Sequence, residues 1–335
     1  MKKGMTFFIG LLLILLIASY FLQGVDDKQH RVLKLAHGLN TQHPVHKAME
    51  FLAERAAELS DGQLEVQIFP SEQLGNEKEC IESLQLGYLA MTKTSTGPME
   101  AFVPRIRIFG IPYLFRDSEH FWKVVLGPIG KDLLLAGEAK GLRGLCYYDA
   151  GARSFYSKEA PINTPSDLVG KKVRVMNSVM SMEMIKAMGG SPTPISWGEL
   201  YTSLDQGVVD AAENNPPSFD TSRHFEICHY YSLDEHVRLP DMLVISARVW
   251  ADLTEQQKQW LQQAVDESVI YDRELWTKAE KKSLEVVKAG GVTVIYPDKE
   301  LFQEAVKPMW NKFLNSDNPE DKTIGTLIQQ IQEIK

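Results

Sequence analysis

The chain has 335 residues, of which 44% are hydrophobic and 24% charged, as in an ordinary soluble protein long enough for two domains. The formal net charge is −8 and no long basic run occurs, which argues against a nucleic-acid-binding surface. The three cysteines, Cys80, Cys146 and Cys228, are too few and too scattered for a disulfide framework or a zinc site. We expect Cys80 and Cys146 to be buried as small hydrophobic residues. A single disulfide bridge is also possible, but the sequence does not assign its two cysteines.

At the N-terminus, Lys2 and Lys3 precede an apolar stretch at residues 5–22. A charged segment followed by an apolar one is typical of an export signal, so we expect residues 1–24 to be a signal peptide cleaved near Gly24. The stretch is long for a secretory signal and approaches the length that spans a bilayer, so an uncleaved membrane anchor is the alternative. In both cases the sequence predicts export to the periplasm.

The segment that follows has the pattern of a first α/β unit. We expect strands at residues 32–36, 64–68 and 88–93, with helices between them at about 45–61 and 77–86. The apolar positions of the first helix follow the 3.6-residue period until Gly62. A β-α-β-α-β order implies a mainly parallel sheet with helices on both faces.

A second set of elements begins near Leu142. We expect strands at residues 142–148, 153–157, 172–176 and 208–211, helices at 179–188 and 197–205, and a strand at 240–246 that returns to the first unit. The two crossings between the units, at residues 148–153 and 236–240, would form a hinge. We therefore assign residues 32–150 and 240–270 to a first lobe and residues 151–239 and 271–335 to a second.

The longest predicted element is a helix at residues 254–288, which no proline or glycine interrupts. At 1.5 Å per residue it reaches roughly 50 Å, enough to span both lobes. The alternative, a coiled-coil arm, lacks a sustained heptad of Leu or Ile. A strand at 292–296 and two further helices complete the chain. The predicted fold is a two-lobed α/β protein with mixed sheets flanked by helices.

Two motifs of the second lobe point to the capture of a small acid. Arg174 stands in the strand-like run of GKKVRVMNS, and its planar guanidinium suits bidentate binding of a carboxylate better than lysine would. Glu213, Asn214 and Asn215 follow a short apolar run in VVDAAENNPP. Ligands of open α/β sheets lie outside the carboxyl ends of strands, where this cluster is expected. The alternative for a single strand arginine is a solvated surface charge.

Several motifs in order make the chain resemble the solute-binding protein of a tripartite ATP-independent periplasmic (TRAP) transporter. They are LKLAHGLN, FPSEQLGNEKE, FGIPYLFRDSEHFW, GKKVRVMNS and PISWGELYTSLDQGVVDAAENNPP, and with the long final helices they cover about residues 32–314. The resemblance implies a two-lobed α/β receptor of the periplasmic-binding-protein kind. Such a receptor closes on an organic acid and delivers it to membrane permease subunits.

The resemblance also implies roles for single positions. Those residues are Arg174 as the carboxylate-binding arginine with Asn177 beside it, Asn214 as an amide on the solute, Arg153 as a second arginine near the hinge, Trp197 as an aromatic that stacks on a sugar ring, and Glu77, Lys93 and Ser95 as contacts from the first lobe. His37 and His236 lie in loops that could also reach the solute. The alternative for Lys93 and Glu77 is a surface ion pair that contributes little to stability, and the alternative for Trp197 is a position in the core.

The motifs AENNPPSF, MTKTS and YSLDEH look like the members that bind hexuronates and related sugar acids, and less like those that bind C4-dicarboxylates or sialic acid. The polar groups that could match solute hydroxyls are Glu77, Ser95, Glu213, Asn214 and Asn215. A buried polar group left unpaired by the wrong ligand is costly, so such groups discriminate. We expect a hexuronate, with a C4-dicarboxylate or another organic acid as the alternative.

The sequence carries no Walker loop, G-x-G-x-x-G or G-x-S-x-G motif. His43 and His46 are spaced as in zinc proteases but lack the glutamate, and we expect them to face solvent. We therefore predict a monomeric binding protein, not an enzyme, that uses neither cofactor nor metal. The rivals are a periplasmic enzyme acting on uronides and a sensor that presents its solute to a membrane receptor.

Overall fold

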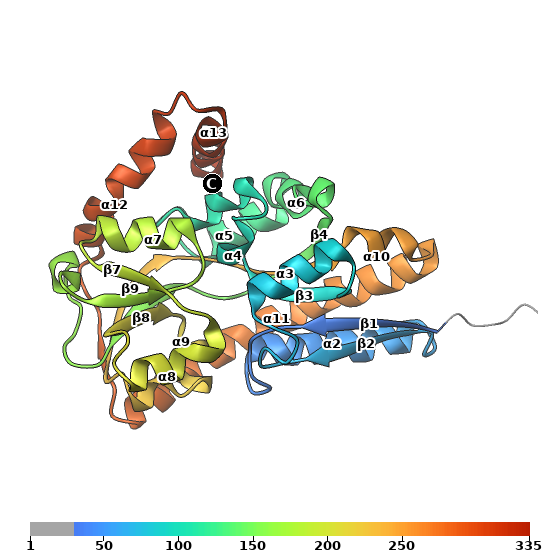
Figure 1. Ribbon diagram of the computed structural model, residues 1–335, viewed down its shortest axis with the longest axis horizontal. Coiled ribbons are helices and arrows are strands. Elements are labelled where there is room, and N and C mark those ends of the chain that lie inside the picture. The colour runs from blue at the N-terminus through green and yellow to red at the C-terminus, as the bar shows by residue number, and fades with distance from the viewer. Residues whose placement is uncertain (1–29) are drawn as a thin grey trace, which may run out of the picture.

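The computed structural model describes residues 30–335, in which two β-sheets lie side by side, each flanked by helices (Figure 1). The signal peptide or anchor predicted at residues 1–24 lies outside the described residues. From residue 30 onward, no helix combines the length and the apolar character needed to cross a bilayer. We call each sheet with its helices a lobe, the first lobe being the one that contains the N-terminal strand.

The first sheet has the strand order β2-β1-β3-β10-β4. Its strands are β1 (Arg31–Ala36), β2 (Leu64–Phe69), β3 (Met91–Ser95), β4 (Leu142–Tyr148) and β10 (Asp241–Ser246). β1 pairs in parallel with β2 and β3, whereas β10 runs antiparallel to both β3 and β4. The strands of the β-α-β-α-β segment therefore pair in parallel as predicted, and the strand that returns from the second lobe inserts antiparallel, which gives the mixed sheet of the predicted fold.

The helices of the first lobe are α2 (Pro44–Leu59), α3 (Glu77–Leu86), α4 (Thr96–Met99), the 3-10 helix η1 (Pro104–Gly110), α5 (Ser118–Leu126), α6 (Pro128–Leu135) and α10 (Ala247–Asp252). The two helices predicted in this lobe, α2 and α3, are confirmed, and the structure adds helices that the sequence did not predict. Helix α3 begins with a capping box between Asn76 and Glu79 and ends at Gly87, whose φ of 77° is the left-handed conformation that favours glycine. This turn delays strand β3, which starts at Met91 and not at the predicted residue 88.

The second sheet has the strand order β11-β9-β5-β8-β6-β7. Its elements are β5 (Arg153–Ser157), β6 (Lys172–Val175), α7 (Val179–Ala187), β7 (Ser191–Pro194), the 3-10 helix η4 (Trp197–Glu199), α8 (Leu200–Asp205), β8 (Ala211–Asn214), α9 (Pro216–Thr221), β9 (Tyr230–Val237) and β11 (Thr293–Ile295). The strand predicted at 208–211 pairs only from Ala211 onward, because Gly207 turns the chain at a φ of 71° after α8.

The chain crosses between the sheets where the sequence predicted it. The β4–β5 connection leads from the first sheet to the second, and the β9–β10 connection leads back. Helix α11 (Glu255–Ala289) confirms the predicted long helix, and it packs against α2 and β4 of the first lobe and α9 of the second. Movement about these crossings stays a prediction.

Two C-terminal helices, α12 (Lys299–Leu314) and α13 (Pro319–Glu333), complete the fold. The Gln332 side chain donates a hydrogen bond to the Leu114 carbonyl at 2.7 Å, and the His120 ring lies 3.0 Å from the Ile331 carbonyl. Helix α13 thus packs on the first lobe, although residues 271–335 are assigned to the second lobe by sequence. The lobe boundaries stay a prediction.

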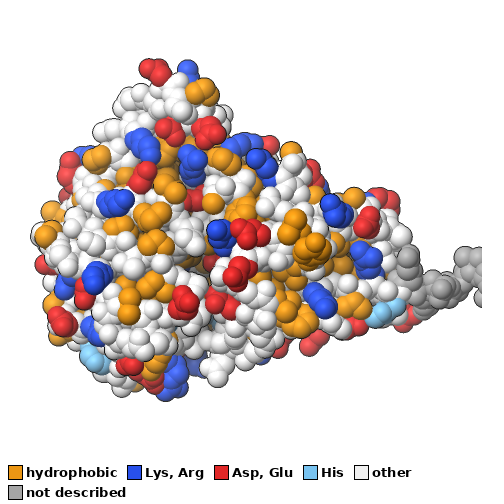
Figure 2. Space-filling model, in the orientation of Figure 1, with side chains coloured by type: hydrophobic (Ala, Val, Ile, Leu, Met, Phe, Trp, Pro, Cys, Tyr) orange, Lys and Arg blue, Asp and Glu red, His pale blue; other side chains and the backbone are white. Residues whose placement is uncertain are grey.

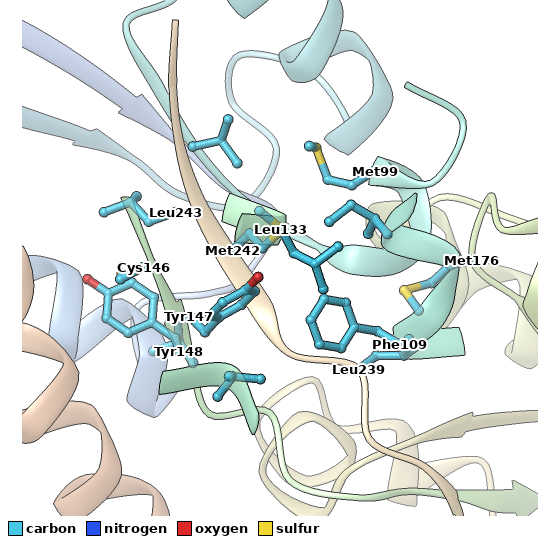
Figure 3. Packing of buried hydrophobic residues seen from close by; sticks show 14 of the residues in the cluster. Met99, Phe109, Leu133, Cys146, Tyr147, Tyr148, Met176, Leu239, Met242 and Leu243 are labelled. Carbon is cyan, nitrogen blue, oxygen red and sulfur yellow. The ribbon is translucent and has the colours of Figure 1, made fainter. Parts of the chain in front are cut away.

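The largest buried hydrophobic cluster of the described residues fills the first lobe and continues into the second, where it includes residues of β5, β6 and α7. Figure 3 shows part of it, in which Phe109, Tyr147 and Met176 lie within one packed region. The Tyr147 hydroxyl donates to the Gly130 carbonyl at 2.9 Å, so its burial leaves no polar group unpaired. The predicted burial of Cys80 and Cys146 is confirmed, and both are free thiols.

Candidate functional site

A narrow cleft between the lobes gathers polar side chains from both sheets. Its lining residues are Gly38, Leu39, Glu77, Lys93, Ser95 and Asp241 from the first lobe, Ala150 and Arg153 from the β4–β5 connection and β5, and Arg174, Met176, Trp197, Asn214, Asn215 and Ser218 from the second lobe. The space within this partly open cleft is about 40 Å³, room for a few water molecules. On the face shown in Figure 2, charged side chains of both signs lie along the seam between the lobes.

Arg174 lies on β6, between the buried Val173 and Val175. It is only 2% exposed, and burial lowers the pKa of its guanidinium. Its Nε donates to the Ile195 carbonyl at 2.9 Å, and its guanidinium carbon lies 5.6 Å from the centre of the Trp197 ring. Its Nη1 is buried and finds no hydrogen-bond partner among residues 30–335. A desolvated guanidinium with an unused donor is a binding group for an anion.

Arg153, at the start of β5, is by contrast already paired. Its Nε and Nη2 donate to the two carboxylate oxygens of Glu213 at 2.5 and 2.9 Å, and its Nη1 donates to Asn214 Oδ1 at 2.9 Å. His236 Nε2 lies 3.4 Å from the same Glu213 carboxylate, and His236 Nδ1 lies 2.8 Å from Asp234. Arg153 therefore lines the cleft as a neutralised cation that fixes the Asn214 amide.

The protonation of this network follows from its pairing. Burial alone would raise the pKa of Glu213, but Arg153 and His236 outweigh it and lower the pKa to about 2. Burial alone would lower the pKa of His236, but Asp234 and Glu213 raise it to about 9. Glu213 is only 1% exposed and lies behind the cleft wall, contrary to the expectation that it faces a solute hydroxyl.

Asn214, the last residue of β8, and Asn215, which follows it, have different roles. Asn214 lines the cleft, and its Nδ2 makes no hydrogen bond within the described part of the chain, so it is a donor for a ligand. Asn215 caps α9, since its Oδ1 accepts from Ser218 N at 2.8 Å, while its Nδ2 donates to the Ala150 carbonyl at 2.9 Å. The Asn215 amide therefore ties α9 to the β4–β5 connection.

The first-lobe wall carries a string of three charged side chains. Lys93 Nζ lies 3.0 Å from Asp241 Oδ2 and 3.8 Å from Glu77 Oε1, which also accepts the Ser95 backbone N–H at 2.8 Å. Lys93 is 3% exposed, so the alternative of a surface ion pair is wrong. The sequence missed Asp241, which faces Ser95 only because β10 pairs with β3.

The remaining predicted residues lie at the edge of the cleft or behind it. Asn177 is exposed and borders the outer part of the cleft together with Arg174 and Trp197. His37 is buried and absent from the lining, because its Nδ1 accepts the Leu39 N–H and its Nε2 lies 3.0 Å from His46 Nδ1. Burial, together with the charge of Lys93, lowers the pKa of His37 to about 2.

The expectation that His43 and His46 face solvent is wrong. They are 2% and 3% exposed, because α2 begins at the boundary with the second lobe. His43 Nε2 lies 3.2 Å from Ser218 Oγ on α9, and its ring lies 5.9 Å from that of Trp276 on α11. His43 therefore links the two lobes and α11.

Further contacts join the lobes on the two sides of the cleft. The Gly198 N–H donates to Glu72 Oε2 at 3.2 Å, and Asn40 Nδ2 donates to the Thr221 carbonyl at 2.8 Å. On the other side, Glu100 Oε1 accepts the Met180 N–H at 3.1 Å, at the first turn of α7. Burial raises the pKa of Glu100 to about 7, although its hydrogen bonds to α7 oppose this rise. The lobes thus touch around a site whose walls differ in charge.

Comparison with known proteins places this architecture in a family. The model of the bacterial extracellular solute-binding proteins, family 7, matches residues 35–317. A TRAP solute-binding protein from a Bradyrhizobium species, in complex with galacturonate, is 39% identical, with a TM-score of 0.86 over 90% of this chain and 100% of its own.

Two further structures have other sugar acids bound. A Polaromonas protein with D-erythronate is 35% identical, with a TM-score of 0.86 over 91% of this chain and 99% of its own. A Chromohalobacter salexigens protein with D-glucuronate is 34% identical, with a TM-score of 0.85 over 90% of this chain and 100% of its own. The chain belongs to the family 7 bacterial extracellular solute-binding proteins, the receptors that bind small organic acids and deliver them to TRAP permease subunits.

Proposed function

We propose that this receptor binds a hexuronate such as galacturonate or glucuronate, with Arg174 as the clamp on its single carboxylate. The observation that carries the proposal is which of the three cationic side chains that line the cleft are paired with a carboxylate. Arg153 is paired with Glu213 and Lys93 with Asp241, whereas Arg174 Nη1 is buried without a partner among the described residues. One unpaired cation matches one carboxylate, since a buried charge needs a counter-charge.

The other lining groups suit the rest of a sugar acid. Asn214 Nδ2 lies on the Arg174 side of the cleft and can donate to a carboxylate or ring oxygen. Ser95, Lys93 and Asp241 on the first lobe offer donors and acceptors to hydroxyls. Trp197, beside the guanidinium, can cover an apolar ring face. The sugar acids in the Bradyrhizobium, Polaromonas and Chromohalobacter proteins support this class of solute.

The cellular setting follows from the N-terminal sequence and the family. We infer that residues 1–24 direct export, so that the receptor meets its solute in the periplasm. It binds the solute and releases it unchanged to the permease. Incubation of galacturonate with the purified protein, followed by NMR of the recovered sugar, tests this: new resonances would favour a uronide-processing enzyme.

Calorimetry on the purified protein, residues 25–335, tests the solute class. Galacturonate or glucuronate should bind more tightly than succinate, because succinate leaves the hydroxyl-matching groups of the first lobe without partners. Each unmet buried group costs about 1–3 kcal/mol, so two of them amount to a hundredfold or more in affinity. Succinate binding as tightly as either hexuronate would refute the sugar-acid assignment. Tighter binding of erythronate would move it to a shorter sugar acid.

A further inference from the structure

We propose that Asp241, together with Glu77, makes the first-lobe wall selective against a second carboxylate, so that the receptor takes uronates and rejects the corresponding aldarates. An aldarate differs from a uronate in that a carboxylate replaces the aldehyde end. The proposal rests on the proposed function, because it takes the first carboxylate of the solute to lie on Arg174. It assigns a role in specificity to Asp241, which lies in none of the sequence motifs.

The charge of the wall is the first step. Two carboxylates, Glu77 and Asp241, share the single ammonium of Lys93, which lies 3.8 Å from one and 3.0 Å from the other. All three line the cleft. The first-lobe wall therefore presents more negative than positive charge to whatever part of the solute lies opposite Arg174. A second carboxylate there meets like charge, in a site with little water to screen it.

The hydrogen-bonding capacity of the wall is the second step. Asp241 Oδ2 lies at Lys93 and Glu77 Oε1 accepts the Ser95 N–H, while Asp241 Oδ1 and Glu77 Oε2 make no hydrogen bond within residues 30–335. An ionised carboxylate only accepts hydrogen bonds, so these two oxygens can take donors from a solute in the cleft but offer none. A hydroxyl or hemiacetal O–H supplies a donor, whereas the second carboxylate of an aldarate has none.

The place of Asp241 in the fold is the third step. It is the first residue of β10, and it stands opposite Ser95 of β3 and Tyr148 of β4 in the sheet register. Both flanking strands hydrogen-bond to β10, so the backbone that carries the carboxylate is fixed on both sides. The carboxylate itself is held by the Lys93 ammonium, 3.0 Å from Asp241 Oδ2, so repulsion from a second anion acts at a fixed place and can serve as a filter.

The test compares D-galacturonate with the two acids that its aldehyde end yields, L-galactonate on reduction and galactarate on oxidation, so that all three keep the same configuration relative to the shared carboxylate. Galacturonate is the proposed solute class, galactonate is an open-chain acid with one carboxylate, and galactarate is an open-chain acid with two. Calorimetry should give galactarate an affinity about a hundredfold below that of galactonate on the wild-type protein, as like-charge contact at a binding site requires. The galactonate arm separates the effect of the second charge from that of ring opening.

Asp241→Asn keeps the shape and removes the charge. It should narrow the gap between galactonate and galactarate at least tenfold, because the amide can donate and Lys93 is freed to meet the second carboxylate. Glu77→Gln makes the same change from α3 and provides the test if the Asp241→Asn protein does not fold. Asp132→Asn is the control, since it removes one negative charge from an exposed ion pair with Arg105 outside the cleft.

The outcomes are distinct. Wild-type protein that binds galactarate as tightly as galactonate overturns the filter, whatever its affinity for galacturonate. An unchanged galactonate-to-galactarate ratio in folded Asp241→Asn and Glu77→Gln proteins also overturns it. Wild-type protein that binds neither galacturonate nor galactonate overturns the proposed function, and the filter with it. A gap that narrows in the two cleft variants and stays in Asp132→Asn supports the filter.

Discussion

Replacement of Arg174 by lysine should weaken galacturonate binding strongly although the positive charge is kept. The guanidinium already uses its Nε on the Ile195 carbonyl, which leaves its two Nη groups for a carboxylate. A lysine ammonium could serve only one of these two functions, and it loses the planar contact with Trp197 as well. One lost charge-assisted hydrogen bond costs about 1.5–3 kcal/mol, which predicts a fall in affinity of about tenfold to 150-fold.

Arg174→Gln, which removes the charge, should cost more, on the order of 2–5 kcal/mol of binding free energy. Isothermal titration calorimetry gives both values, and thermal unfolding checks that the fold is intact. Arg143→Lys is a matched control, since Arg143 also lies over a tryptophan, with its guanidinium carbon 4.7 Å from the Trp250 ring, but outside the cleft. Wild-type affinity in folded Arg174→Gln protein would refute the clamp.

Three other predictions concern closure, protonation and stacking. Galacturonate should lower the radius of gyration in small-angle scattering, since both lobes supply lining groups, and an unchanged value at saturation would count against closure. Burial raises the pKa of Glu100 to about 7, so the folded state favours its protonated form and stability should be lost as the pH rises from about 4.5 through 7. Glu100→Gln should abolish this part of the pH dependence, which amounts to a change on the order of 3 kcal/mol in the free energy of unfolding. Urea unfolding of both proteins at pH 5 and pH 8 measures it. The same change in the free energy of unfolding for wild type and Glu100→Gln would contradict the prediction. Trp197→Ala should weaken galacturonate about fivefold to tenfold and Trp197→Phe less, by calorimetry, and equal losses would argue against stacking.

The sequence predicted those parts of the fold that local patterns determine. Helix α2 follows from its unbroken apolar periodicity, and α11 from a long run without proline or glycine that starts at Thr254, where the structure has a capping box. The antiparallel insertion of β10 could not be predicted, because its partners β3 and β4 lie far away in the chain and no local feature specifies strand order. The late start of β8 reflects both the local turn at Gly207 and the pairing with β5, and only the pairing is equally non-local.

In the site, too, local patterns could be predicted from the sequence and contacts between distant residues could not. The burial of Arg174 next to Trp197 agrees with the motifs, which lie near the ends of adjacent elements. The position of Glu213 could not be foreseen, because its partner Arg153 lies 60 residues away and turns the carboxylate into the wall. Asp241 was missed for a similar reason, since its contact with Lys93 joins residues 148 positions apart.

If the lobes close about the two chain crossings as predicted, the position of the site residues gives a small solute a direct means to drive the movement. Arg153 is the first residue of β5 after one crossing, and Asp241 is the first residue of β10 after the other. Both line the cleft, so the side chains at the solute are covalently next to the segments that must rotate when the lobes move. The Asn215 amide adds a bond to the Ala150 carbonyl within the first crossing. Solute contacts that held Arg153, Asn214 and Asp241 in one arrangement would therefore bias the crossings directly, and the predicted closure would need no longer chain of side chains to couple it to binding.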